Sequence, residues 1–385
     1  MPQSTLSHLE CARCGARLDA DVEQHSCSCG GPLRARYDLE KAARTLTKQT
    51  IEERPADLLR WVELLPLRDP AGAVTLGERE TPLVRLDRTG AAFEIEHLIV
   101  KDESQLPTGS FKARGAAIGV SRARELGIQT LTLPTNGNAG AAWSAYAARA
   151  GIKAHVVMSH DAPPIHRREC TMAGADVHLV HGSIADAGRL SAEFVQSQGW
   201  YDASGQREPY RVEGKKTMGF EIARAFDWRL PDVIVYPTGG GLGFIGIHKA
   251  FEELQALGLV GTRLPRFVAV QSSGCAPLVR AWNDRAEIAA PWVNPTTIAY
   301  GINVPKTLGD FLVLDILRKT SGTAIAIDDS DIATTREHVG REEGIPVGPE
   351  GAATLAAARA LRKSGWIGSG ERVLAINTGS GLKYL

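Results

Sequence analysis

The segment LPTGSFKARG, residues 106–115, places Lys112 directly after a turn of small residues. A lysine amine can condense with an aldehyde or move a proton when a pocket shields it from water. The same letters also describe an ordinary capped helix with a surface lysine, which is the commoner situation for this residue type. Chemistry elsewhere in the chain has to decide between these two interpretations.

A glycine-rich stretch, YPTGGGLGFIG at residues 236–246, lies between an apolar run and a helical pattern. Backbone N–H groups in such a stretch, aimed by a helix N-terminus, can bind a phosphate. A P-loop is excluded because no Gly-Lys-Ser/Thr follows. Gly241, Gly243 and Gly246 fit the G-x-G-x-x-G fingerprint, but the next strand runs into Gln271 instead of a ribose-binding carboxylate. The stretch predicts a phosphate site, with a nicotinamide enzyme or a ligand-free turn as alternatives.

Two further loops combine small residues with polar side chains. PTNGNAG, residues 134–140, offers the amides of Asn136 and Asn138 and N–H groups that can hold a carboxylate. INTGSGLK, residues 376–383, places the hydroxyl of Thr378 between an apolar run and two glycines. Each could be a plain turn. Together the four segments supply an amine, a phosphate nest, a carboxylate loop and a hydroxyl, which are the parts that pyridoxal phosphate chemistry needs.

Four cysteines lie close together near the N-terminus. CARCG contains Cys11 and Cys14, and CSCGG contains Cys27 and Cys29. A C-x-x-C pair followed at this distance by a second pair indicates a structural zinc knuckle, although C-x-C is tighter than usual. His25 could replace one thiolate, and a metal-free vestigial ribbon is the alternative.

The elements that must position these loops follow from the alternation of apolar and helical patterns. Apolar runs that predict strands are QTLTL (129–133), AHVVM (154–158), DVHLV (176–180), DVIVY (232–236), RFVAV (266–270), TAIAI (323–327) and RVLAI (372–376). Helical patterns between them include residues 139–150, 243–257 and 351–363. Near-continuous apolar strands that alternate with helices predict parallel sheets covered on both faces. The fold class is therefore α/β with two doubly wound parallel-sheet domains, and ligands are expected beyond the carboxyl ends of the strands.

Composition limits the classes of function. The chain has 385 residues with 44 basic and 44 acidic side chains, so no basic field favours nucleic acid. No apolar run reaches the ~18–20 residues of a membrane span, and the N-terminus MPQSTLSHLE does not resemble a secretory signal. Six cysteines in so long a chain do not make a disulfide framework. We expect a cytoplasmic protein with a small-molecule substrate.

The motifs resemble those of the fold-type II pyridoxal-phosphate enzymes, and within them threonine synthase and its close paralogues. The likeness runs in order from about residue 78 to the C-terminus and rests on PTGSFKARG, TNGNAGAAWSAYAARAG, RVEGKKTMGFEIA, GGGLG and NTGSGLK. It implies a tryptophan synthase β-like fold and a homodimer. The expected division is a zinc-ribbon-like extension at 1–36, a large cofactor-binding domain at 37–110 plus 213–385, and a smaller, mobile domain at 111–212.

The resemblance also implies roles for individual residues. Lys112 would bind pyridoxal 5′-phosphate as a Schiff base and act as acid and base, with Ser110 beside it. The other residues implied to contact the cofactor are Asn138 at the phenolic oxygen, Gly239, Gly240, Gly241, Leu242 and Gly243 at the phosphate, and Thr378 at the pyridine nitrogen. Those implied or considered for the substrate are Thr135, Asn136 and Gly137 at its carboxylate, and Arg114 and Lys216 at its phosphate.

The implied reaction converts O-phospho-L-homoserine and water to L-threonine and phosphate. Threonine synthases usually carry Asp after the lysine, and here Ala113 takes that place, a pattern that also resembles threonine dehydratases and serine racemases. A dehydratase, or a paralogue that carries out β- or γ-replacement on another activated amino acid, is therefore the alternative within the class. A regulatory protein that binds the cofactor without turnover is the alternative of another class.

Overall fold

A computed structural model describes residues 3–385. Contacts divide the chain into two compact units. Unit 1 comprises the chain up to Glu80 with Lys112–Phe220 and Glu252–Leu259, and unit 2 comprises Thr81–Phe111, Glu221–Phe251 and Val260–Leu385. The domain division predicted from the sequence groups residues 37–80 differently, and the mobility expected for 111–212 stays a prediction.

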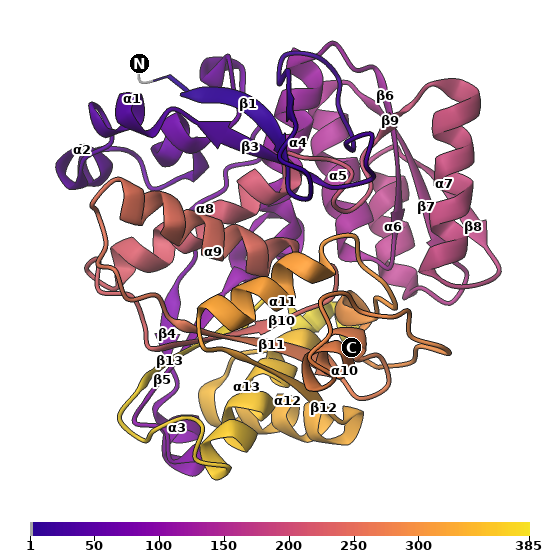
Figure 1. Cartoon of the computed structure of the whole chain (residues 1–385). Helices are drawn as coiled ribbons and strands as arrows, with labels where there is room; N and C mark the ends of the chain where they lie inside the picture. Colours follow the sequence, from indigo (N-terminus) through magenta and orange to yellow (C-terminus); the bar gives the residue numbers. More distant parts are fainter. Residues whose placement is uncertain (1–2) are drawn as a thin grey trace. The chain divides into compact units, whose positions relative to one another are not determined.

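Unit 1 begins with a small antiparallel sheet in the order β2-β1-β3, formed by β1 (Leu6–Cys11), β2 (Arg17–Leu18) and β3 (Leu33–Tyr37). Leu9 pairs with Leu18 on one side and with Ala35 on the other. Buried Leu9 and Ala35 join a core that also contains Ile118 and Tyr210 from later in the chain. This small sheet therefore packs on the rest of unit 1 (Figure 1).

Short helices and 3₁₀ segments connect this sheet to the larger one, with Pro55 between α2 and η1. They are α1 (Leu39–Ala43), α2 (Lys48–Glu53), η1 (Leu58–Leu64) and η2 (Pro70–Gly72). Thr47 and Thr50 form a capping box that starts α2.

The larger sheet of unit 1 is parallel, with the order β8-β7-β6-β9. Its elements are α4 (Lys112–Glu125), β6 (Thr130–Thr135), α5 (Asn138–Ala150), β7 (Lys153–Ser159), α6 (Pro164–Met172), β8 (Asp176–Val180), α7 (Ile184–Gln198), β9 (Tyr201–Asp202) and α8 (Arg211–Ala225), which begins in this unit. The chain moves outward from β6 to β8 and then returns to β9. Because such crossovers are right-handed, α5 and α6 cover one face and α7 covers the other (Figure 1).

Unit 2 contains a six-stranded sheet with the order β12-β11-β10-β13-β5-β4. All neighbours are parallel except β4, which pairs antiparallel with β5. Its elements are β4 (Leu83–Arg85), α3 (Asp87–Phe93), β5 (His97–Asp102), η3 (Glu103–Gln105), η4 (Pro107–Gly109), β10 (Val233–Pro237), α9 (Leu242–Ala256), β11 (Arg266–Ser272), α10 (Pro277–Asn283), η5 (Tyr300–Ile302), α11 (Asp310–Lys319), β12 (Thr323–Ile327), α12 (Asp329–Glu343), α13 (Pro349–Lys363), β13 (Arg372–Asn377) and η6 (Gly381–Tyr384).

The path of the chain through this sheet changes direction at β10. The chain runs from β10 outward to β12 and then returns to β13 on the other side of β10. By the same handedness rule, α9, α10 and α11 cover one face, and α12 and α13 cover the other. The centre of the sheet is buried on both faces, and every residue of β10 is buried. Ligands of doubly wound sheets bind at such a reversal.

The seven predicted strands and three predicted helices are all present, with bounds shifted by at most a few residues. One further helix, α3 (Asp87–Phe93), was not predicted from the sequence and lies between β4 and β5. Buried Thr89, Gly90 and Phe93 anchor that helix, but seven residues are too few for a clear helical period.

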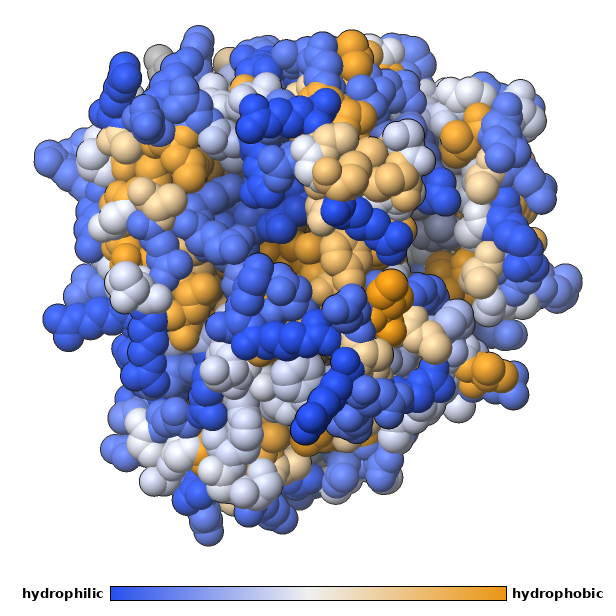
Figure 2. Space-filling model, in the orientation of Figure 1, coloured by the Kyte–Doolittle hydropathy of each residue, from blue (hydrophilic) through white to orange (hydrophobic). Residues whose placement is uncertain are grey.

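Polar side chains cover much of the face shown in Figure 2, with apolar side chains in separate patches. Among residues 3–385, no helix combines the length and the apolar character that a membrane crossing requires.

Candidate functional site

Lys112 is the first residue of α4 and is only half-buried, whereas Ala113 and Arg114 after it are fully buried. The turn before it is η4, in which Thr108 has φ 60° and Gly109 has φ 63°. Left-handed backbone is unusual for threonine, and such strain persists where the surroundings impose it, often at functional sites. A helix that begins at Lys112 is confirmed.

The turn that leads into Lys112 is fastened to the loop after β13. The Phe111 amide donates to the Thr378 carbonyl at 3.0 Å, and the Ser380 amide donates to the Gly109 carbonyl at 2.9 Å. Ser110 forms a β-bridge with Gly379 between these two bonds. Thr378 is therefore hydrogen-bonded to Phe111, the residue before Lys112, although 267 positions separate Phe111 and Thr378 in sequence.

Two hydroxyls of this turn are held in unusual surroundings. Ser110 is fully buried, and the Oγ1 atom of half-buried Thr108 is buried as well. Within the part of the chain that the structure describes, neither hydroxyl has a hydrogen-bond partner. A buried hydroxyl without a partner costs about 1–3 kcal/mol, so these two groups mark a place where a polar ligand would be stabilised.

Hydrogen bonds at the carboxyl end of β13 position the loop that follows this strand. Asn377 is buried, donates from Nδ2 to Asp102 Oδ1 at 2.8 Å, and accepts from the Gly348 amide at 3.2 Å. Because β13 and β5 are adjacent parallel strands, Asn377 and Asp102 lie opposite each other at their carboxyl ends. These bonds fix the position of Thr378, whose side chain is buried.

The glycine stretch follows β10, the neighbour of β13, so three loops meet this edge of one sheet. A Cβ on Gly239 would lie 2.8 Å from the Gly301 carbonyl oxygen, and one on Gly241 would lie 2.7 Å from Val313 Cγ2. Gly241 also has φ 76°. Backbone alone fits here, which is what a nest of N–H groups at the start of α9 requires.

Gln271, where a dinucleotide-binding protein would carry its ribose-binding acid, has another role. Its amide Nε2 donates to the Thr238 carbonyl at 3.0 Å, and its Oε1 accepts from the Leu278 amide at 2.8 Å. This buried side chain ties the end of β11 to the start of the glycine stretch. The nicotinamide alternative thus lacks its ribose ligand.

In unit 1, the asparagine loop is organised by Thr135 at the end of β6. Its Oγ1 accepts from the amides of Gly137 at 2.9 Å and Gly140 at 3.0 Å. Gly137 has φ 149° and packs directly on the ring of buried His166. This leaves Asn138 at the first turn of α5, where backbone N–H groups point outward.

The cations expected near a substrate phosphate lie in different surroundings. Buried Arg114 donates from Nη1 to Thr217 Oγ1 at 2.8 Å. Lys216 is fully buried and pairs with Glu213 at 2.6 Å and with Glu253 at 2.9 Å. Burial opposes its charge, but these two carboxylates raise the pKa of Lys216. A charge already compensated in this way argues for a structural role, and its contact with substrate stays a prediction.

Lys215, in the RVEGKKTMGFEIA segment, is a further buried amine. Burial, together with the neighbouring charges of Lys112 and Arg211, lowers the pKa of the Lys215 ammonium well below its ordinary value. Its Cε lies 3.3 Å from the position of a Cβ on Gly115, one turn into α4. Lys215 is therefore an amine of unit 1 whose charge interacts with that of Lys112.

Three more residues, which were not predicted from the sequence, contact the glycine stretch or the turn before Lys112. Thr307 Oγ1 donates to the Gly240 carbonyl at 3.0 Å, and the Gly301 carbonyl packs on Gly239, so segment 300–307 covers the glycine stretch. Lys383 Cε lies 3.2 Å from the position of a Cβ on Gly109. Only Lys383 had a signal in the sequence, because it stands in the INTGSGLK motif.

The four N-terminal cysteines converge in unit 1. The sulfur atoms of Cys11, Cys14, Cys27 and Cys29 all lie within 4.8 Å of one another. His25 lies outside this group, and its Nε2 is 2.9 Å from Glu23 Oε1, so the expectation that it could replace a thiolate is not supported. A backbone hydrogen bond from Cys29 lowers the pKa of Cys27 to about 6.

Comparison with known proteins identifies the family to which these motifs belong. A family model described as pyridoxal-phosphate dependent enzyme matches residues 74–379. The chain is similar to threonine synthase of Methanocaldococcus jannaschii, with 33% identity over 97% of this chain and 92% of the relative. It is similar to threonine synthase of Methanosarcina acetivorans, with 36% identity over 98% of this chain and 92% of the relative.

Solved structures with the same fold share less sequence. Maize serine racemase aligns with a TM-score of 0.67 at 24% identity, covering 79% of this chain and 88% of that chain. Diaminopropionate ammonia lyase from Escherichia coli aligns with a TM-score of 0.69 at 20% identity, covering 80% and 85%. At these identities the likeness establishes the fold alone.

Proposed function

Because this chain belongs to the family of pyridoxal-phosphate dependent enzymes, we propose that it is a lyase of the threonine synthase type. The reaction would convert O-phospho-L-homoserine and water to L-threonine and phosphate. The likeness to archaeal threonine synthases supports this assignment because it extends over nearly the whole length of both chains, including the N-terminal cysteine region. Dehydratases and racemases resemble this chain at lower identity and over a smaller part of it.

The observation that carries the proposal is the attachment of the Lys112 turn to the Thr378 loop. When bound, pyridoxal phosphate supplies an aldehyde that condenses with amines and a ring that withdraws electrons. A neutral hydroxyl such as that of Thr378 stabilises a charged ring nitrogen less than a carboxylate would. Eliminations that expel a good leaving group tolerate the weaker electron withdrawal, whereas transamination is disfavoured.

The residues present fit this cofactor. The partnerless hydroxyl of Ser110 and the glycine cradle at Gly239 and Gly241 each suit a polar, phosphorylated ligand. We assign the phosphate to the amides of residues 239–243, the phenolic oxygen to Asn138, the ring nitrogen to Thr378 and the covalent link to Lys112.

Lys112 is the acid and base of the proposed reaction. Its amine would remove the α-proton of the substrate and then move a β-proton, while the C–O bond at the γ-carbon breaks and phosphate leaves with the electron pair. A proton returns to the γ-carbon, and water adds its hydroxyl at the β-carbon and its proton at the α-carbon. Burial favours the neutral amine of the neighbouring Lys215, so that residue adds little positive charge beside Lys112.

The substrate would be held at both ends. The loop Thr135–Gly137, shaped by the Thr135 hydroxyl, offers backbone N–H groups for the carboxylate. Arg114 is the guanidinium proposed for the phosphate, since its planar donors match phosphate oxygens. Lys216 is the weaker candidate because Glu213 and Glu253 already compensate its charge.

A product assay tests the proposal. The purified protein, reconstituted with pyridoxal phosphate, is given O-phospho-L-homoserine, L-threonine or L-serine in parallel reactions. We expect threonine and phosphate in equal amounts from the first and no keto acid from the others. Phosphate without threonine would contradict the synthase, and 2-oxobutyrate from threonine would establish the dehydratase instead. Cofactor binding with no turnover would favour a regulatory protein.

The remaining parts of the proposal rest on the family resemblance. We propose a homodimer in the cytoplasm and a smaller domain, residues 111–212, that moves during the reaction. Analytical ultracentrifugation of the reconstituted protein tests the dimer.

A further inference from the structure

The N-terminal cysteine cluster lies outside the residues that the family model matches, which begin at 74. We propose that Cys11, Cys14, Cys27 and Cys29 bind one Zn²⁺ ion, and that this structural ion clamps the β1–β3 sheet onto α4 and α8. These helices carry Lys112 and Lys215. The proposal concerns the architecture of unit 1 and stands whether or not the chain makes threonine.

The sulfur positions fit a tetrahedral metal site. Cys11 Sγ lies 3.5 Å from Cys29 Sγ, and Cys14 Sγ lies 3.6 Å from Cys27 Sγ. A disulfide would bring sulfur atoms to about 2.05 Å. A zinc ion with Zn–S bonds of about 2.3 Å holds tetrahedral sulfurs about 3.8 Å apart. Each close contact joins a cysteine of one knuckle to a cysteine of the other, so both knuckles face one centre.

The backbone around the cysteines is shaped to the same centre. Gly15 and Gly30 close the two knuckles with φ 71° and 77°. The Arg13 amide donates to Cys11 Sγ at 3.4 Å, an interaction that favours a thiolate ligand. A Cβ on Gly31 would lie 2.6 Å from Cys11 Sγ, so only glycine fits beside this sulfur. Four thiolates complete a tetrahedron and leave no open position, which indicates a structural and not a catalytic ion.

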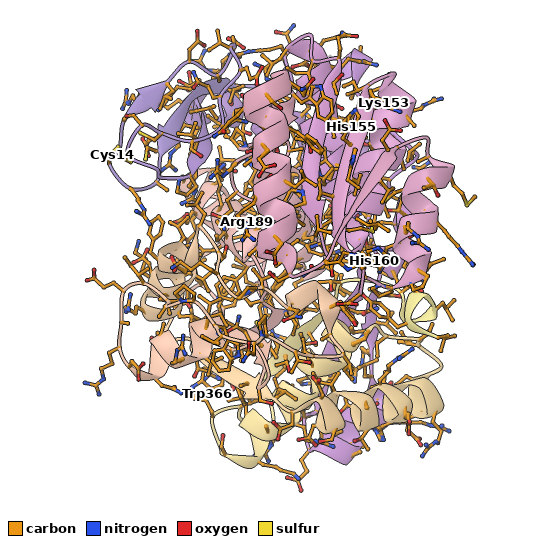
Figure 3. The ribbon with its side chains drawn as sticks, turned by 90° about the vertical axis from the view of Figure 1, so that its right-hand side faces the viewer. Cys14, Lys153, His155, His160, Arg189 and Trp366 are labelled. Carbon is orange, nitrogen blue, oxygen red and sulfur yellow. The ribbon has the colours of Figure 1, made fainter. Side chains whose placement is uncertain are left out.

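The small sheet has too little core to be stable alone. Fewer than about 40 residues rarely bury enough apolar surface without a metal or disulfides. The core of the sheet contains Leu9, Leu33 and Ala35 together with the sulfur-bearing Cys11 and Cys27. Cys14, by contrast, is exposed at the tip of its loop (Figure 3). An ion at the cluster would cross-link the ends of β1 and of the loop before β3.

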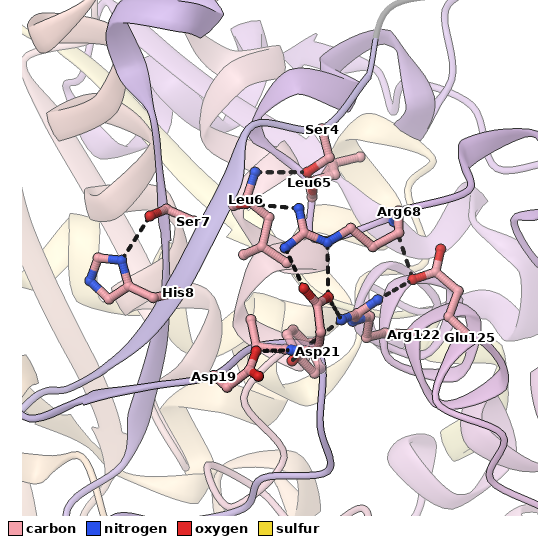
Figure 4. Close-up of polar contacts among 12 residues, drawn as sticks. Ser4, Leu6, Ser7, His8, Asp19, Asp21, Leu65, Arg68, Arg122 and Glu125 are labelled. Atoms are coloured by element: carbon pink, nitrogen blue, oxygen red, sulfur yellow. Dashed lines mark hydrogen bonds and ion pairs between the residues drawn. The ribbon is translucent and has the colours of Figure 1, made fainter.

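Polar contacts then connect the sheet to α4. The Ala20 carbonyl, in the loop between the knuckles, accepts from Arg122 Nη2 at 2.6 Å and from the Tyr210 hydroxyl at 2.9 Å. Asp21 pairs with both Arg122 and Arg68 (Figure 4). Since Arg122 belongs to α4, the loop that the ion would fix is fastened to the helix that begins at Lys112.

A second set of contacts connects the sheet to α8. The hydroxyl of Tyr37, the last residue of β3, donates to Glu213 Oε2 at 2.8 Å. Glu213 pairs with Lys216, whose Nζ lies 4.1 Å from the centre of the Tyr37 ring. Gly214 of α8 packs on the backbone of Arg114 so closely that a Cβ would collide with its carbonyl oxygen. The clamp thus reaches both helices through buried groups.

Metal analysis tests the site on the full-length protein. We expect one zinc per chain by elemental analysis, four sulfur neighbours by X-ray absorption, and thiolate-to-metal charge-transfer absorption after Co²⁺ replacement. The double variant Cys14→Ser/Cys29→Ser should lose the metal, whereas Cys275→Ser, which alters a buried thiol elsewhere, should keep it. Absence of stoichiometric metal from protein grown with zinc would overturn the proposal.

Hydrogen exchange tests the clamp without relying on a variant that folds. Chelation of the wild-type protein should lower Tm and increase amide exchange in residues 33–37 and 211–217. Zinc should restore both, whereas Mg²⁺ should not, and β12 in unit 2 should be unaffected. Unchanged exchange in residues 211–217 after complete metal removal would refute the clamp. Because none of these readouts depends on substrate, failure of the threonine synthase assay would not affect them.

Discussion

The glycine stretch of unit 2 and the cysteine cluster of unit 1 are two proposed sites for charged ligands built in opposite ways. At Gly239–Gly243 the proposed ligand groups are backbone amides, and Gly239 and Gly241 have no room for a side chain because the Gly301 carbonyl and Val313 lie too close. At Cys11–Cys29 the ligand groups are side chains, and the backbone only turns them inward. The difference teaches which substitutions each site tolerates.

A site made of backbone groups is lost when something is added, and a site made of side chains is lost when something is removed. Lys112 combines both situations. Its amine is a side-chain group, but the turn before it is held by backbone bonds to the Thr378 loop. Variants of Lys112, of the glycine stretch and of the supporting contacts therefore test the reacting amine, the shape of the cofactor site and the stability of the fold separately.

The largest effect is expected at Lys112. Lys112→Ala removes the amine that would carry both the covalent link and the proton transfers, so kcat should fall about 10³-fold or more. The visible absorption of the lysine-bound cofactor should disappear as well. Lys363→Ala, an exposed lysine at the end of α13, is the matched control and should keep both. A Lys112→Ala protein that turns over normally would remove the basis of the proposed chemistry.

An intermediate effect is expected when a methyl group is added to the glycine stretch. Gly239→Ala places a Cβ 2.8 Å from a carbonyl oxygen of the backbone, which costs about 1–3 kcal/mol and should weaken cofactor binding roughly 10- to 100-fold. Gly188→Ala, in α7, adds a Cβ with nothing within 4 Å and should bind the cofactor as well as the wild type. Equilibrium dialysis with pyridoxal phosphate measures both variants. Equal affinities would mean that the close approach of Gly301 does not shape the site.

A smaller effect is expected at Thr378. Thr378→Val keeps the shape and removes the hydroxyl, and loss of one hydrogen bond of about 1–1.5 kcal/mol predicts a roughly 10-fold decrease in kcat. The Phe111–Thr378 backbone bond remains, so Tm should change little. A decrease in Tm with unchanged kcat would show that the side chain supports the loop and does not act on the cofactor.

The smallest effect on activity is expected at the contacts between the N-terminal sheet and α8, where the change is in stability. Tyr37→Phe removes the hydrogen bond to buried Glu213 and should lower the free energy of unfolding by about 1–2 kcal/mol. Urea denaturation of Tyr37→Phe, Glu213→Gln and the double variant forms a cycle that isolates this pair. Strict additivity would indicate that the two side chains are not coupled.

The parallel sheets were predictable from the sequence because strands that are buried on both faces consist of nearly continuous apolar residues. DVIVY and RFVAV match β10 and β11 to within two residues, because these strands are buried along almost their whole length and no polar alternation blurs their limits. Helix α3 was missed because a seven-residue helix with three buried side chains leaves too little periodicity. Burial patterns are local, so local sequence reveals them.

Contacts between segments that are far apart in the sequence were harder to predict. The bond between Phe111 and Thr378 follows from the adjacency of β5 and β13, and strand order is a property of topology and not of either strand. The packing of Gly301 on Gly239 and of His166 on Gly137 depends on loops whose conformation no period encodes. The cysteine cluster was accessible because four identical ligands at short spacing define a site without knowledge of the fold.

The central claim is that the protein breaks the γ-carbon–oxygen bond of a phosphorylated amino acid and adds water at the β-carbon, with Lys112 as acid and base. The most direct measurement is turnover of O-phospho-L-homoserine in ¹⁸O-labelled water, with both products analysed by mass spectrometry. The account predicts one ¹⁸O atom in the threonine hydroxyl and none in the released phosphate, because the bond that breaks joins carbon to oxygen. Labelled phosphate with homoserine as the other product would contradict it, since the protein would then be cleaving the phosphorus–oxygen bond.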